Sequence, residues 1–95
     1  GKFLAAVTAL GRRLESYAAW PAAIALYERA LAAEPLGEAT YRGLMRCLTA
    51  QDDAGAAVST YRRCAEVLLR ETGRPVSAET AKLAAQLQLV SEAAP

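Results

Sequence analysis

The chain has 95 residues, which is the size of one small domain. Apolar residues make up 54% of it and charged residues 22%, so the composition excludes an intrinsically disordered chain. Alanine and leucine occur 23 and 13 times, whereas valine occurs five times and isoleucine once. Alanine and leucine favour helices and β-branched residues favour strands, so the composition predicts an all-α fold.

The charge and the chemically active residues limit the function. Eleven Lys and Arg against ten Asp and Glu leave a net charge of +1, without the basic excess of a nucleic-acid-binding domain. The chain has no His and two Cys, so it lacks the commonest general base and the usual ligands of a zinc site. We therefore expect no enzyme, no metal, no cofactor and no direct nucleic acid contact.

The apolar segment at residues 3–10 is too short to span a membrane. It is also no signal peptide, because Arg12 and Arg13 follow where small residues should form a cleavage site. We expect a cytoplasmic domain without membrane contact. The first residue is Gly and not Met, which indicates a fragment of a longer protein.

The first half of the chain predicts a helix hairpin. On one face of the first helix lie Phe3, Val7, Leu10 and Leu14. A turn follows at residues 16–19, and Pro21 suits the first position of a second helix, where its missing N–H costs nothing. The second helix ends before Pro35, because the residue that precedes a proline resists the α conformation.

The second half predicts another hairpin and a closing helix. Tyr41, Leu44, Met45 and Leu48 line the third helix. Asp52 and Asp53 cap the fourth helix, and Gly73 ends it. Ser77 caps a fifth helix, expected over residues 77–92, with apolar or small contact positions at Thr80, Leu83, Leu87 and Val90.

The two hairpins repeat each other at a constant offset in the sequence, the interval from Leu10 to Leu44. The other recurring pairs are Leu14 and Leu48, Ala23 and Ala57, Tyr27 and Tyr61, Arg29 and Arg63, and Ala30 and Cys64. Such a period is typical of stacked hairpins that bury a shared core, with repeats here at 4–37 and 38–71. Small residues such as Gly11, Ala23 and Ala30 mark the points where helices should cross closely.

These residues resemble a tetratricopeptide repeat. The first unit carries Leu10-Gly11, Leu14, Trp20, Ala23, Tyr27, Ala30 and Pro35, with Val7 in place of the leading Trp. In the second unit Met45 replaces the Gly, Cys64 an Ala, and Leu69 the Pro. The resemblance implies a right-handed stack of two tetratricopeptide-like hairpins with a C-terminal capping helix, in one domain over residues 1–95.

A narrower resemblance is to the bacterial transcriptional activator domain. It is carried by residues 30–36, 41–46 and 61–64, by Leu68, Glu71 and Gly73, and by residues 77–80. Arg74-Pro75-Val76 departs from the pattern, because relatives carry an acidic residue and then Pro before the Ser. In that family the domain follows a winged-helix DNA-binding domain and serves as a contact and dimerisation module.

The candidate binding residues face away from the packing stripes, on the first helix of each unit. They are Thr8, Arg12, Glu15, Ser16, Arg42, Arg46 and Thr49. Guanidinium groups suit carboxylates, so the three arginines predict a groove for an acidic segment of a partner protein. The alternative is a solvated helix face with incidental charges.

Other features have plainer explanations. Cys47 and Cys64 lie on the two helices of one hairpin, where a redox switch is conceivable, but buried inert thiols are favoured. Trp20 occupies the aromatic position of the repeat, which indicates packing rather than ligand binding. The favoured function is a regulatory interaction or dimerisation domain of a bacterial transcription regulator. The alternative is a repeat scaffold in an assembly unrelated to transcription.

Overall fold

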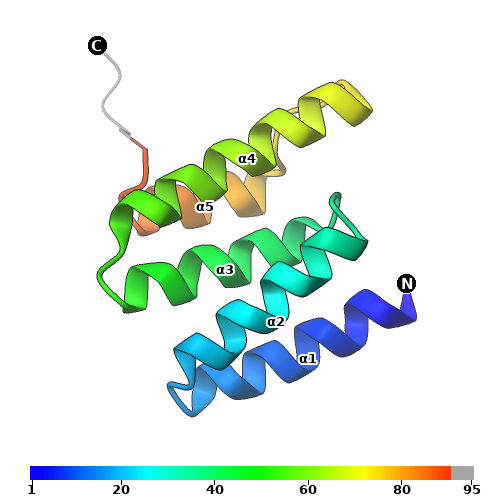
Figure 1. The fold of residues 1–95 in the computed structure, drawn as a ribbon. Coiled ribbons are helices and arrows are strands. Elements are labelled where there is room, and N and C mark those ends of the chain that lie inside the picture. The colour runs from blue at the N-terminus through cyan, green and yellow to red at the C-terminus, as the bar shows by residue number, and fades with distance from the viewer. Residues whose placement is uncertain (91–95) are drawn as a thin grey trace.

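The computed structural model describes residues 1–90, and these form five α-helices and no strand. The helices are α1 (Lys2–Ser16), α2 (Trp20–Ala33), α3 (Glu38–Ala50), α4 (Ala54–Thr72) and α5 (Ala78–Gln86). Figure 1 shows two antiparallel hairpins, α1–α2 and α3–α4, with α5 beside the second. The all-α prediction is confirmed.

Three helices begin at the residues that the sequence indicates, with a proline at the start of α2 and side-chain caps at the starts of α4 and α5. Pro21 stands in the first turn of α2, where no hydrogen bond is lost. The Asp53 side chain accepts a hydrogen bond from the Ala56 N–H at 3.2 Å at the start of α4. The Ser77 hydroxyl accepts from the Thr80 N–H, also at 3.2 Å, at the start of α5. Each cap satisfies an N–H group that has no partner within its own helix.

Four helices end through a residue in the left-handed conformation: Gly73, with a φ angle of 70°, ends α4 as predicted, and a non-glycine residue ends each of α1, α3 and α5. Ala18, Asp52 and Gln88 have φ angles of 55°, 59° and 60°. In each case the next N–H reaches back to a carbonyl five residues earlier, which is the Schellman arrangement. Asp52 is the counterpart of Ala18 in the second repeat, so the repeat extends to the turns as well as to the helices.

The same arrangement ends the fifth helix earlier than expected. α5 stops at Gln86, whereas the apolar spacing predicted a helix through residue 92. Gln88 turns the chain, and this turn buries Leu89 against the core while Val90 stays 37% exposed. Burial of Leu89 favours the turn over further helix. Residues 91 and 92 of the expected helix lie outside the described part of the chain.

α3 is the central helix and contacts each of the other four. One core cluster joins the two hairpins, and its buried members are Val7, Ala23, Tyr27, Ala30, Leu31, Tyr41, Leu44, Cys47, Cys64, Val67 and Leu68. A second cluster of Met45, Ala57, Ala84 and Leu89 joins α5 to the second hairpin. Stacking of hairpins therefore supplies the buried surface that a single hairpin lacks.

Tyr27 is the largest side chain buried between the hairpins, with 1% of its surface exposed. An added Cβ at Gly11 in α1 would overlap the Tyr27 hydroxyl and ring, and one at Gly43 in α3 would lie 2.5 Å from the ring. The ring thus fills a slot between two glycines. The expected close approach at Gly11 is confirmed. Gly43 was not predicted because its counterpart in the first unit is Ala9.

We predict that Gly43→Ala lowers the free energy of unfolding by about 2 kcal/mol, because a methyl group overpacks the Tyr27 slot. Urea denaturation followed by circular dichroism measures the change. Gly55→Ala is the control, since nothing lies within 4 Å of its Cβ position, and it should raise the stability by about 0.5 kcal/mol. Equal effects at both glycines would contradict the slot.

Candidate functional site

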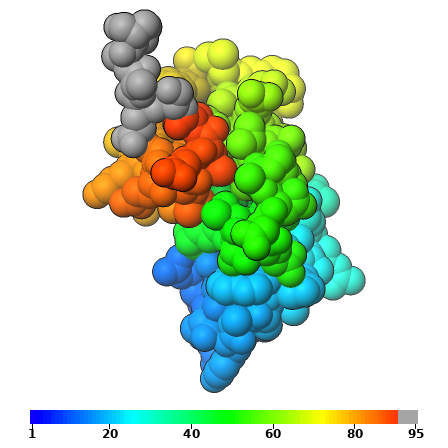
Figure 2. Space-filling view, turned by 90° about the vertical axis from the view of Figure 1, so that its left-hand side faces the viewer, coloured from blue at the N-terminus to red at the C-terminus, as the bar shows by residue number. Residues whose placement is uncertain are grey.

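The concave groove of the molecule lies between α1, α3 and α5. It consists of two adjoining hollows of about 280 and 230 Å³, which share Arg42, Arg46 and Glu79. Its other lining residues are Thr8, Arg12, Ala39, Lys82, Leu83 and Gln86. In Figure 2 α1 (blue) and α5 (orange) flank α3 (green) on this side of the molecule. The groove therefore presents mainly long polar and basic side chains.

One arginine of the groove is held by a contact between the hairpins. Arg46 of α3 forms two hydrogen bonds with the Glu15 carboxylate of α1, from Nε to Oε1 at 2.8 Å and from Nη2 to Oε2 at 3.1 Å. The Tyr27 hydroxyl of α2 donates to the same Oε2 at 2.5 Å. Glu15 is only 10% exposed and Arg46 25%. A bidentate pair in this setting acts as a structural tie among three helices.

The ionisation of these groups follows from their contacts. Burial by itself raises the pKa of Glu15, but the hydrogen bonds from Arg46 and Tyr27 and the charge of Arg46 outweigh it, so the pKa lies below its ordinary value. Burial, followed by the hydrogen bond to Glu15, raises the pKa of Tyr27. At neutral pH the carboxylate is therefore ionised and the phenol remains a donor.

A second polar cluster fastens α5 to α3. The Glu38 carboxylate accepts from the Ser77 N–H at 3.0 Å and from the Ser77 hydroxyl at 2.8 Å, and it also accepts from the Thr80 hydroxyl. Arg42 donates to the Thr80 oxygen at 2.9 Å and lies 3.5 Å from Glu79. Burial raises the pKa of Glu38, but these hydrogen bonds and the Arg42 charge bring it below its ordinary value.

The structure brings four of the seven candidate residues together in the groove: Thr8, Arg12, Arg42 and Arg46. The other three do not line it. Glu15 lies beneath Arg46, the Ser16 hydroxyl donates to the Arg13 carbonyl at 2.6 Å, and the Thr49 hydroxyl is enclosed without a partner within residues 1–90. These three residues therefore do not line the two hollows, because Glu15 and Ser16 bond to nearer groups of the protein and the Thr49 hydroxyl is enclosed.

The pairing also changes which cations are available. Arg46 and Arg42 have protein partners, whereas Arg12 and Lys82 form no ion pair among the described residues. Lys82 was missed by the sequence analysis, which took only the first helix of each repeat. The signal was present in the spacing, since Glu79, Lys82 and Gln86 share one face of the fifth helix.

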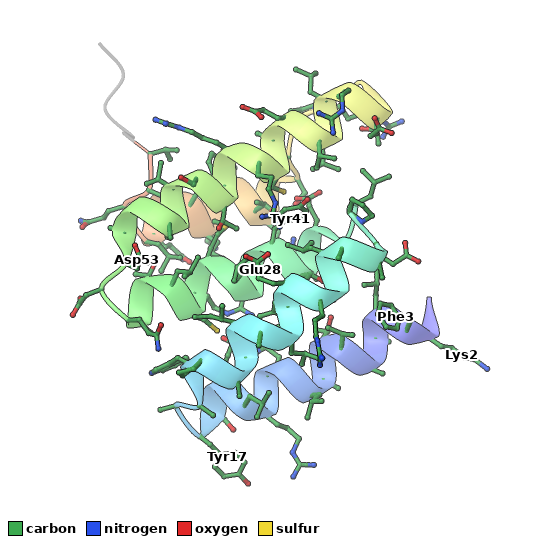
Figure 3. The ribbon with its side chains drawn as sticks, viewed as in Figure 1. Lys2, Phe3, Tyr17, Glu28, Tyr41 and Asp53 are labelled. Carbon is green, nitrogen blue, oxygen red and sulfur yellow. The ribbon has the colours of Figure 1, made fainter. Side chains whose placement is uncertain are left out.

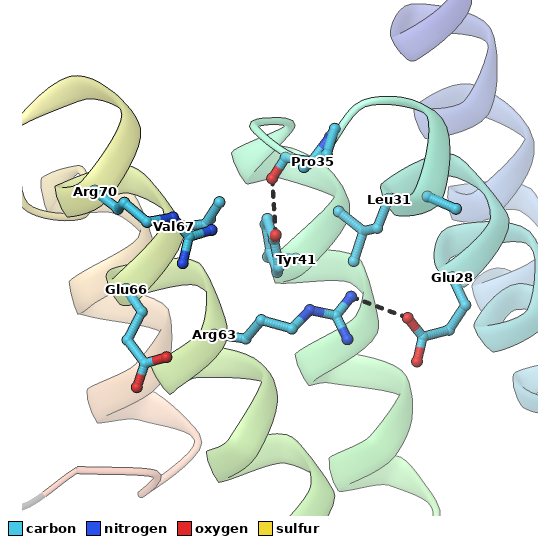
Figure 4. A pocket seen from close by; sticks show the side chains of 9 residues that line it. Glu28, Leu31, Pro35, Tyr41, Arg63, Glu66, Val67 and Arg70 are labelled. Carbon is cyan, nitrogen blue, oxygen red and sulfur yellow. Dashed lines mark hydrogen bonds and ion pairs between the residues drawn. The ribbon is translucent and has the colours of Figure 1, made fainter.

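A separate hollow of about 400 Å³ lies on the opposite side, between α2 and α4 (Figure 4). Arg63 crosses it to pair with Glu28 at 3.1 Å and lies 5.5 Å from the centre of the Tyr41 ring. The Tyr41 hydroxyl donates to the Pro35 carbonyl at 2.7 Å. Arg63 and Glu28 are about half exposed, so this pair contributes little to stability.

The remaining candidates are core residues. Both Cys47 and Cys64 are fully buried and unpaired, and burial raises the pKa of Cys47 to about 11 and that of Cys64 to about 12. The preference for buried thiols is confirmed. Trp20 packs against the main core cluster, as predicted. Within residues 1–90 no group of three or more His, Cys, Asp or Glu side chains is placed to hold a metal ion.

A comparison with protein-family models decides which family the chain belongs to. The model of the bacterial transcriptional activator domain matches residues 1–88, nearly the whole chain. The chain belongs to this family. The resemblance seen in the sequence is thereby confirmed, and the domain is one of transcriptional activators. Comparisons with curated proteins and with solved structures give no match. No helix in the described part of the activator domain is long and apolar enough to cross a membrane.

We predict that Glu15→Gln lowers the free energy of unfolding at pH 7 by about 1.5 kcal/mol, because Arg46 loses its charged partner. Since folding lowers the pKa of Glu15, its ionised form stabilises the fold above the unfolded-state pKa, and this contribution is lost as the pH falls through the folded-state pKa. The difference between the two proteins should therefore shrink below about pH 5.

Urea titrations across pH measure this difference. The matched control is Glu66→Gln on the exposed surface of α4, which should change the stability by less than about 0.5 kcal/mol at any pH. A pH-independent cost of Glu15→Gln would show that the ion pair is not its source.

We also predict that neither thiol reacts with a water-soluble disulfide reagent while the chain is folded, because both are fully buried and protonated. Two thiols per chain should react once urea unfolds it. Ser59→Cys, at an exposed position of α4, supplies a positive control that reacts at once. Rapid reaction of Cys47 or Cys64 in the native state would contradict their burial.

Proposed function

We propose that the domain is the regulatory protein-interaction module of a bacterial transcription regulator and that it binds an acidic segment of a partner in the concave groove. The proposal treats residues 1–95 as one domain of a longer regulator, whose DNA-binding domain lies elsewhere in that polypeptide. Its support is the family match together with the excess of basic groups along the groove.

The observation that carries the proposal is that only some of the four cations in the groove form ion pairs within the protein. Arg46 is committed to Glu15, whereas Arg12 and Lys82 lie at opposite edges of the groove without ion pairs in residues 1–90. Arg42 lies between them, and its exposed partner Glu79 is 76% accessible. A carboxylate of the partner replaces Glu79 at low cost, because exposed ion pairs contribute little.

This arrangement favours binding over catalysis. The best-placed charged groups, Glu15, Arg46 and Glu38, are held in structural contacts, and no nucleophile with an adjacent base is found within residues 1–90. Docking of a partner would then control the position of the DNA-binding domain in the cytoplasm. The family match favours this role over a general repeat scaffold outside transcription.

A fluorescently labelled peptide of alternating Glu and Gly residues tests the groove. We expect the variant Arg12→Glu/Lys82→Glu to weaken its binding at least about tenfold, as the loss of two charge-assisted contacts implies. The control Arg29→Glu/Arg62→Glu makes the same charge change on exposed positions of α2 and α4 and should leave the affinity within about twofold.

Fluorescence anisotropy at low and high salt measures the affinities. Equal losses of affinity in the two double variants would show that net charge alone causes the effect. Unchanged binding by the groove variant would exclude the groove as the binding site. Light scattering across concentration tests the other expected partner, a second copy of the chain. A dimer that dissociates in the groove variant would assign the groove to self-association.

A further inference from the structure

A line of exposed apolar side chains runs along α1, away from the concave groove. Phe3, Leu10 and Tyr17 are 51%, 50% and 75% exposed and lie seven residues apart, so they fall on one line of the helix. Exposed Ala6 and Arg13 lie between them. We call these five residues the outer face of α1. Figure 3 shows Tyr17 pointing away from the body of the molecule at the end of the helix.

The internal repeat shows what kind of surface this is. In the second repeat the counterparts of its first four residues are Gly37, Thr40, Leu44 and Cys47, and all four are buried. Gly37 lies against Leu4 of α1, and Leu44 and Cys47 belong to the cluster that joins the hairpins. The outer face of α1 therefore corresponds to the face of α3 against which the preceding helices α1 and α2 pack. In α1 the same face has no helix upon it within the described structure.

Charge decides between a second copy and a different partner. The cations beside the apolar line are Lys2 and Arg13, and both are exposed. The only carboxylate of α1 is Glu15, which is turned inward onto Arg46 and Tyr27. Two outer faces brought together would place cations near cations with no acidic group of either helix to compensate.

We propose that the outer face of α1 binds one amphipathic helix whose apolar stripe is bordered by Asp or Glu residues. Phe3 and Leu10 supply the apolar contact, and Lys2 and Arg13 pair with the acidic border. This surface is distinct from the groove, and its occupant is recognised by apolar spacing as well as by charge.

Two synthetic helical peptides test the proposal on the 95-residue chain. Both are Ala-based and carry leucines at i, i+3, i+7 and i+10, and they differ only in having Glu or Lys beside the stripe. By fluorescence anisotropy we expect the Glu peptide to bind at least about tenfold more tightly than the Lys peptide. Equal affinities, or no binding of the Glu peptide, would overturn the proposal.

Variants place the binding on the outer face. Leu10→Ser should weaken binding of the Glu peptide about tenfold. Tyr17→Ser should also weaken this binding, and Tyr17 is too exposed for the change to affect folding. Arg13→Glu should weaken it as well, whereas Lys82→Glu makes the same charge change in the groove and should leave it unaltered. A reversed order of these two charge variants would place the peptide in the groove and overturn the inference.

A second copy is the competing occupant. Analytical ultracentrifugation across concentration distinguishes it, because the proposal predicts that the outer face does not hold two chains together. A dimer that Leu10→Ser dissociates would assign this face to self-association, against the charge argument. Circular dichroism of each variant confirms that the helices are retained.

Discussion

The insertion of Tyr27 between Gly11 and Gly43 sets the geometry of the whole domain. The ring lies where side chains of α1 and α3 would otherwise stand, so the two helices approach each other on either side of one residue of α2. Its hydroxyl then donates to Glu15, which in turn holds Arg46. Because α1 and α3 are fixed in this way, their other faces form two walls of the concave groove.

Apolar packing repeats along the chain, whereas the polar contacts do not. The counterpart of Glu15 one repeat later is Thr49, which cannot form an ion pair. The joint between α3 and α5 depends instead on Glu38, at the other end of the helices. The Thr49 hydroxyl, which is enclosed and has no partner among residues 1–90, marks the place where the first contact is not reproduced. Each joint of the stack is therefore fastened by its own set of charged residues.

This difference explains how far the sequence could be interpreted. Helix starts, the constant offset between the repeats and the shared direction of Arg12, Arg42 and Arg46 follow from local spacing and were predicted. The contacts of Arg46 with Glu15 and of Arg42 with Thr80 join residues distant in the chain and depend on the final packing, so they could not be predicted. Lys82 was not predicted as a groove residue because α5 does not follow the constant offset between the repeats. Its buried Thr80 and Ala84 repeat Thr40 and Leu44 at a wider offset, owing to the longer α4.

The contact that holds the helices together also determines the charge that α1 presents. Glu15 is the only acidic residue of α1, and the fold withdraws it from solvent to pair with Arg46. Lys2, Arg12 and Arg13 are thereby left exposed without a compensating carboxylate on their own helix. A chain with a net charge of +1 thus gains a locally basic helix, since the interior has taken its counter-charge. Both proposed surfaces, the groove wall at Arg12 and the outer face at Lys2 and Arg13, take their preference for acidic partners from this one internal ion pair.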